Sequence, residues 1–387
     1  MKKQLLALAV TSAFAVPAMA QNVTLSGVID LSPYQIDNIE HKASATAATN
    51  ETKRASTTNA VANGGFATSV LNFTGTEDLG GGLRATFFVN QSLNGNTGAL
   101  GGRDMWLQLN GGFGAFKLGR YHPNINGYGG FSSTGSSNLA GSTDFSGFGL
   151  INGTLGVDQT RATQTGTVNR AAGGDFSRQP GVLQYTTPSF SGLTGWVEYI
   201  SNTLDSSDLN NKAKTSQYGL GANFVRGPLT LAAGYGSRDL DDEATTATGF
   251  SAKREAKVFW LGARYNFGVA EVQYSYGDRE DKSDAVADGT AFTTNGVRGK
   301  TSDITVHTIG VRVPLGSAQL FANFFDGEDK RNGTSALKTD LSGFQLGARY
   351  NLSRRTYLYF VHGKNESDRS NYAIERTNTA LGLVHTF

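Results

Sequence analysis

The sequence contains no cysteine, and it has only 7 prolines among 387 residues. Without thiols the chain has no disulfide framework, no thiol nucleophile and no cysteine-based zinc site. After Ala20 it also lacks any uninterrupted apolar run of roughly 18 residues, the length that a membrane-spanning helix needs. If this chain crosses a membrane, it is therefore expected to do so with strands.

The chain that remains after removal of a predicted signal segment has no net charge. Residues 1–20 are typical of a secretory signal, with Lys2 and Lys3 before an apolar stretch and a small-residue cleavage site ending at Ala20. Its removal leaves 34 − 2 = 32 basic residues against 32 acidic ones. A chain without a basic excess is not expected to bind nucleic acid. The predicted division is a signal peptide at 1–20 and one domain at 21–387.

Patterns typical of an enzyme or a metal site are absent from the sequence. The five histidines have no i, i+2 or i, i+4 spacing that would suit a metal ion. No Gly-x-Ser-x-Gly elbow occurs, and the phosphate-loop ending at Gly299-Lys300-Thr301 has Thr294 where the motif needs glycine. We therefore expect no catalytic residues, no metal site and no cofactor.

What the sequence does contain is strict alternation. Segments of about ten residues, the length of a tilted membrane strand, place apolar and polar side chains at alternate positions. Between residues 270 and 276, for example, Val272 and Tyr274 alternate with Glu271 and Gln273. Sixteen such segments can be counted between residue 22 and Phe387, and each would have one apolar and one polar face.

The connections between these segments are short and long in turn. Arg226-Gly227 is one of the short ones, and residues 37–66 and 122–178 are the longest. This alternation is typical of transmembrane barrels. The predicted fold is all-β, a 16-stranded antiparallel transmembrane β-barrel with long external loops. The segment that ends at Phe387 is expected to pair with the first strand and to matter for assembly, because a barrel in lipid leaves no open edge.

Four short motifs carry a resemblance to a known family: NFTGTEDLGGGL at 72–83, GFGAFKLGR at 112–120, GARYNLS at 347–353 and GLVHTF at 382–387. In order and spacing they resemble the general porins of Gram-negative outer membranes, in their β-proteobacterial branch. The resemblance implies a homotrimer in outer-membrane lipid, with the third loop folded into the barrel. It also implies a water-filled channel for passive diffusion of small hydrophilic solutes and ions.

The resemblance further implies a constriction at which wall arginines face acids of the third loop. Arg120 matches one wall arginine, whereas Val70 and Gln184 stand where related porins commonly carry a basic residue. The third loop supplies few acids, among them Asp144 and Asp158. The predicted pore constriction therefore consists of Arg120, Asp144, Asp158 and Gln184.

Arginines also lie on the polar phase of their segments, close to short turns. They are Arg84, Arg264, Arg312 and Arg349. Such lumen residues would favour anions, which predicts a mild anion preference. The alternative is that they are solvated charges paired with Asp30, Glu198 or Glu271.

Other functions remain open at this stage. A substrate-selective outer-membrane channel is the main alternative, because the third loop is long enough to provide a binding track. An outer-membrane enzyme would need a catalytic constellation, and none is visible. A soluble β-rich adhesin would not explain the strand period or the turn pattern.

Overall fold

The structure is a computed structural model, and it describes residues 23–44, 47–63, 66–95, 97–126, 178–206, 211–244, 251–283, 299–331, 337–369 and 372–387. The predicted signal peptide lies outside these residues. The elements are β1 (Val23–Ser44), β2 (Ala47–Asn63), β3 (Val70–Gly80), β4 (Leu83–Leu93), β5 (Leu100–Gly111), β6 (Gly114–Tyr121), η1 (Asn124–Asn126), β7 (Gln179–Thr186), β8 (Leu193–Ser206), β9 (Asn211–Arg226), β10 (Leu229–Ala244), β11 (Ser251–Asn266), β12 (Glu271–Ser283), β13 (Gly299–Leu315), β14 (Ala318–Arg331), β15 (Leu337–Asn351), β16 (Thr356–Arg369) and β17 (Tyr372–Thr386).

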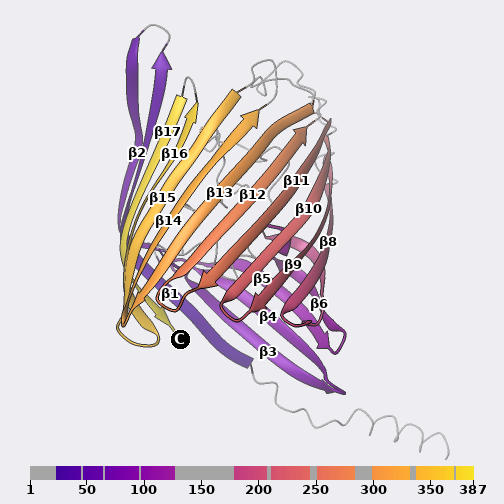
Figure 1. Cartoon of the computed structure of the whole chain (residues 1–387). Coiled ribbons are helices and arrows are strands. Elements are labelled where there is room, and N and C mark those ends of the chain that lie inside the picture. The colour runs from indigo at the N-terminus through magenta and orange to yellow at the C-terminus, as the bar shows by residue number, and fades with distance from the viewer. Residues whose placement is uncertain are drawn as a thin grey trace, which may run out of the picture.

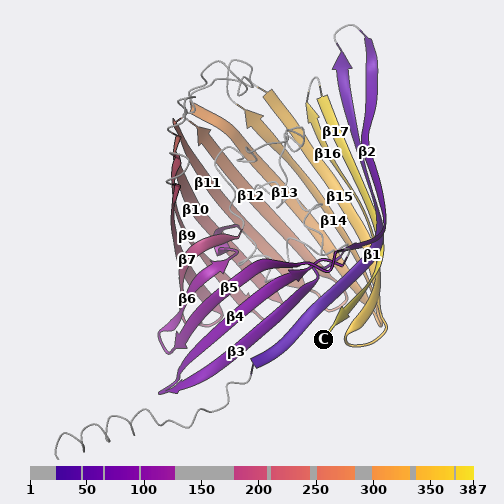
Figure 2. The same ribbon diagram turned by 180° about the vertical axis from the view of Figure 1, so that it is seen from behind.

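The strands form one closed antiparallel barrel (Figures 1 and 2). From β3 to β17 each strand pairs with the next, and β1 closes the circle by pairing with β3 on one edge and β17 on the other. Fifteen strands from β3 to β17 plus β1 give sixteen barrel positions. The predicted 16-stranded barrel is confirmed, and so is the pairing of the last strand with the first.

The seventeenth strand corrects one predicted connection. Residues 37–66 are not an irregular loop: β1 continues to Ser44, and β2 folds back on it as a hairpin that rises beyond the barrel (Figure 1). β2 and β3 occupy the same edge of β1 in succession, at Leu31 to Ser44 and Val23 to Val28. The upper part of β1 also pairs with β17, whose hydrogen bonds extend the sheet past the rim.

The two faces of the barrel differ as the alternation predicts. On β12, Gln273 and Ser275 are buried toward the lumen, and Val272 and Tyr274 are exposed on the outside. The described residues contain no helix with the length and apolarity that a bilayer crossing requires. The outer apolar surface is that of a transmembrane barrel, and it leaves the polar side chains for the interior.

The tight connections lie at one end of the barrel, where β1 begins and β17 ends (Figure 1). At the β13–β14 turn Gly316 has a φ of 63°, in the left-handed region that glycine adopts without steric cost. This short-turn rim carries the arginines predicted to surround one mouth of the lumen.

Candidate functional site

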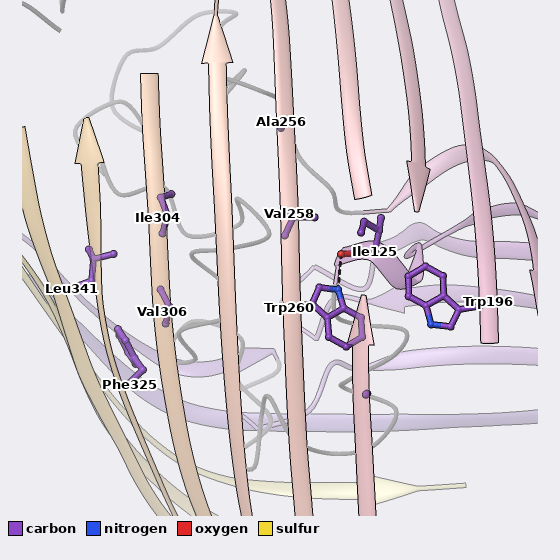
Figure 3. Close-up of a cluster of buried hydrophobic side chains, with 10 residues drawn as sticks. Ile125, Trp196, Ala256, Val258, Trp260, Ile304, Val306, Phe325 and Leu341 are labelled. Atoms are coloured by element: carbon purple, nitrogen blue, oxygen red, sulfur yellow. Dashed lines mark hydrogen bonds between the residues drawn. The ribbon is translucent and has the colours of Figure 1, made fainter. Parts of the chain in front are cut away.

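The third long connection begins inside the barrel. After β6 the chain forms the single turn η1, and Ile125 at its centre is completely buried against the wall. The Glu198 carboxylate on β8 accepts hydrogen bonds from the backbone N–H groups of Asn124 and Ile125, both at 2.8 Å. From β11, the indole N–H of Trp260 donates to the Ile125 carbonyl oxygen at 3.0 Å (Figure 3).

Two stacked indoles support this loop start. Trp196 and Trp260 lie with ring centroids 6.5 Å apart and planes inclined by 17°. Each ring covers a glycine of a neighbouring strand: a Cβ atom on Gly221 would lie 2.4 Å from Trp196, and one on Gly234 would lie 2.7 Å from Trp260. No larger residue at Gly221 or Gly234 leaves room for these rings. Ile125 itself packs on two other glycines, since a Cβ atom on Gly236 would lie 2.4 Å from it and one on Gly219 3.0 Å from it. The indoles and these glycines form the apolar seat of Ile125.

The apolar seat extends across the wall toward later strands. Ala256, Val258, Ile304 and Val306 continue it, with Phe325 and Leu341 at its far side (Figure 3). The alternation predicts a polar face toward the lumen, and this apolar stripe departs from that prediction. The stripe could have been found in the sequence, because apolar residues stand at the inward positions of these strands where polar residues are expected.

Gln184, one of the predicted constriction residues, lies on the inward phase of β7 with 4% exposure. Its side-chain amide donates to Glu198 at 3.3 Å. Lys117 is opposite Gln184 on β6, and its ammonium lies 3.9 Å from the centre of the Tyr121 ring. Lys117, Gln184 and Glu198 thus cross three adjacent strands at the foot of the third connection.

Arg120 is placed differently from the prediction. It alternates with Lys117, Gly119 and Tyr121, and so it shares the outward phase with Leu118 and is exposed. Its guanidinium donates to the carbonyl oxygens of Gly102 and Arg103 near the start of β5. The structure therefore places Arg120 away from the predicted lumen position: it stands opposite Met105 of β5, which is exposed on the outer face, beside a register shift between Gly119 and Tyr121. Lys117 supplies the inward cation of this strand.

The two predicted loop acids, Asp144 and Asp158, lie outside the described residues. Where the chain re-enters the wall, Arg178 forms an ion pair with Asp104 of β5. Burial lowers the pKa of the nearby His122 imidazole to about 4, and the positive charge of Arg178 acts in the same direction. His122 is therefore neutral at neutral pH.

The four predicted lumen arginines all lie at the short-turn rim on the inward phase. Arg264, Arg312 and Arg349 come from β11, β13 and β15 and form a row along one wall, whereas Arg84 on β4 is exposed elsewhere on the rim. Glu271 lies between two of them, with its carboxylate 3.9 Å from Arg264 and 3.4 Å from Arg312. We call Arg264, Arg312 and Arg349, with Glu271, the rim row.

Of the three acids considered as partners of these arginines, only Glu271 is paired with them among the described residues. Asp30 instead accepts from the backbone N–H groups of Phe66 and Ala67 and from the Tyr359 hydroxyl at 2.7 Å. Phe66 then packs on Tyr359, with ring centroids 5.0 Å apart. Asp30 and Glu198 thus serve the same purpose, since each is a buried carboxylate that holds the backbone where a connection meets the wall.

No group of three or more histidines, acids or cysteines within the described residues could hold a metal ion. The site consists of a lumen wall, a loop foot anchored to it and a row of arginines at the short-turn mouth. Such an arrangement can select solutes that pass along the wall by their size and charge.

Comparison with known proteins agrees with this arrangement. A family model described as Gram-negative porin matches residues 7–370. Outer membrane porin protein 32 of Delftia acidovorans is 26% identical over 380 residues, which cover 95% of this chain and 91% of that protein.

Two solved structures have a similar fold. An anion-selective porin from Comamonas acidovorans has a TM-score of 0.66 at 22% identity, covering 95% of this chain and all of that one. OmpT, an outer membrane protein of Vibrio cholerae described in a trimer form, has a TM-score of 0.57 at 16% identity, again covering 95% of this chain and all of that one.

Proposed function

The chain belongs to the Gram-negative porin family, and from this premise we propose that it forms a homotrimeric diffusion pore with a mild preference for anions. The family is one of outer-membrane channels rather than of enzymes. A barrel of about sixteen strands is too wide for side chains to fill, and it leaves an aqueous channel for small hydrophilic solutes and ions.

The observation that carries the anion preference is the charge of the rim row. Three guanidinium groups stand against one carboxylate, so the row has a formal charge of +3 − 1 = +2. Lys117 adds a further inward cation at the foot of the third connection. Among the inward acids, Asp30 and Glu198 accept hydrogen bonds from backbone N–H groups and lie at 0% and 4% exposure, and Asp281 is paired with Arg279. These three acids therefore present little charge to passing ions.

Reversal potentials in a gradient of potassium chloride test this proposal. We expect an anion-selective potential at low salt. It should fade as salt rises, because the Debye length falls from about 10 Å at 0.1 M to about 3 Å at 1 M. A cation-selective potential at low salt would exclude the proposed preference, and an absence of conductance would exclude the pore.

The homotrimer is supported by the resemblance to trimeric porins and by the trimer form of OmpT. Mass measurement of the purified protein in mild detergent tests it directly. Three copies are expected, and a monomer that retains full conductance would contradict the trimer.

We further propose that residues 1–20 are removed on export, which leaves a single barrel domain from Gln21 to Phe387. The basic start, apolar centre and small-residue end of this segment support the proposal. N-terminal sequencing of protein from the outer membrane should begin at Gln21. A mature protein that still begins at Met1 would refute it.

A further inference from the structure

The rim row has many more hydrogen-bond donors than acceptors. Each guanidinium carries five N–H donors, so three of them offer about fifteen. The contacts found for them are weak: Arg264 reaches Thr230 at 3.4 Å, and Glu271 lies 3.4 Å and 3.9 Å from its two arginines. Well-formed bonds between a guanidinium and a carboxylate are about 2.7–2.9 Å long. The single acid therefore leaves most of these donors available.

Some of the available donors are already removed from bulk solvent. The Nε atoms of Arg312 and Arg349 are buried, and neither has a hydrogen-bond partner within the described part of the chain. A buried donor without a partner costs about 1–3 kcal/mol, which an acceptor recovers once the side chain turns this donor toward it. The side chain of Arg312 is still 28% exposed, so an acceptor can reach this group from the lumen.

The spacing of the row suits an acceptor with more than one charge. Arg312 and Arg349 flank β14, where they stand opposite Phe321 and Gln319. Adjacent strands lie about 4.8 Å apart, so the two arginine strands are separated by about 10 Å. Long guanidinium side chains can converge across that gap on one small ligand, and a second negative charge would then meet a second arginine.

The row also lies beside a cavity of suitable size. An open recess of about 400 Å³ at the same rim is lined by Thr230, Arg264, Asn266 and Glu271, with glycines of the two adjacent turns. Sites for small molecules typically occupy about 300–1,000 Å³. Val225 and Pro228 complete its lining, and Arg264 and Glu271 are the members of the rim row that line it.

On these grounds we propose that the rim row is a binding site for small polyvalent oxyanions, such as dicarboxylates or phosphates, at the short-turn mouth of the pore. The proposal rests on the proposed anion-preferring pore and adds to it a binding site that the ligand can saturate. Glu271 lies between Arg264 and Arg312 and competes with the ligand for their donors.

Block of single-channel potassium chloride currents by succinate tests the site, with acetate at equal ionic strength as the monovalent control. Succinate should saturate the block at concentrations about tenfold below acetate, the difference expected for one additional charge-assisted hydrogen bond. Arg312→Gln and Arg349→Gln should each weaken the succinate block about tenfold for the same reason. Glu271→Gln should strengthen it, because its arginines lose their competing carboxylate.

Arg354→Gln is the matched control, because Arg354 is exposed at the tip of the β15–β16 turn and lies outside the row. It removes the same charge from the same mouth, and the succinate block should change less than about twofold if the row binds as a site rather than through a diffuse field. Equal losses in Arg349→Gln and Arg354→Gln, weaker block in Glu271→Gln, or equal potency of succinate and acetate would each overturn the site.

Conductance without succinate separates this proposal from the previous one. Channels that conduct and prefer chloride, but show equal block in all variants, refute the site alone. Channels that do not conduct refute the pore itself. Folding of each variant is checked by the difference in gel migration between heated and unheated samples. Arg349→Lys, which retains the charge but loses the guanidinium fork, replaces Arg349→Gln if that variant fails to fold, and it should also weaken the succinate block.

Discussion

Replacing Glu198 should release the start of the third connection from the barrel wall. Its carboxylate, 4% exposed, accepts two consecutive backbone N–H groups at 2.8 Å, which belong to Asn124 and Ile125. In Glu198→Ala both donors lose their partner inside the barrel. At about 1–3 kcal/mol for each buried donor, the anchoring of the loop foot weakens by about 2–6 kcal/mol.

A graded series makes this magnitude testable. Glu198→Gln keeps one acceptor oxygen of similar position, so it should lose about half as much as Glu198→Ala. Glu328→Gln is the matched control, because Glu328 pairs with Lys330 and Lys338 at exposed positions, and such pairs contribute less than about 1 kcal/mol.

Two measurements report the result. The free energy of unfolding in detergent, followed by the shift in gel mobility, should fall in the order control, Gln and Ala. The noise of the open-channel current should rise in the same order, because a released loop foot moves within the conducting path. If Glu198→Ala unfolds like the parent protein and conducts with unchanged noise, the carboxylate does not anchor the loop.

Three further predictions follow from strand parity, packing and burial. Lys117→Glu should shift the reversal potential toward cations, whereas Arg120→Glu, on the outward phase, should leave it nearly unchanged; equal shifts would contradict the placement of the two residues. A methyl group on Gly27 would lie 2.4 Å from the ring of Phe387, so Gly27→Ala should lower the yield of folded barrel. Gly102→Ala is the control, because its methyl group would meet no atom within 4 Å, and equal yields of the two variants would contradict the packing. The pKa of His122 is about 4 in the folded barrel against an ordinary 6.5, so between pH 6.5 and pH 4 only the unfolded chain gains a proton, and the barrel should lose stability as the pH falls through this range. His122→Gln should remove this loss, which is measured as the difference between the melting temperatures at about pH 7 and pH 4.5. The same difference in the variant and the parent protein would refute the prediction.

The barrel could be predicted from the sequence because its determinants are local. A period of two over about ten residues sets both the strand and its faces, and the turn lengths set the order of neighbours. The same parity placed Arg264, Arg312 and Arg349 on the lumen side, as the structure has them. Closure then follows, because an unpaired edge in lipid is too costly.

The candidate site was harder to predict because its contacts join distant parts of the chain. Nothing near Glu198 in the sequence indicates that it binds the backbone of residues 73 and 74 positions away. Arg120 was assigned from a motif, although its own parity with Leu118 places it outside. The β1–β2 hairpin was taken for a loop, since its pairing with β17 depends on a strand more than 300 residues later.

The way in which the loop foot is held also bears on how such pores can diversify. Glu198 binds main-chain N–H groups, and every residue except proline supplies one. The anchor therefore does not depend on the side chains at positions 124 and 125 for its hydrogen bonds. Mutation and recombination can then change the length and composition of the segment that follows, while Glu198 continues to bind the backbone at the start of the loop.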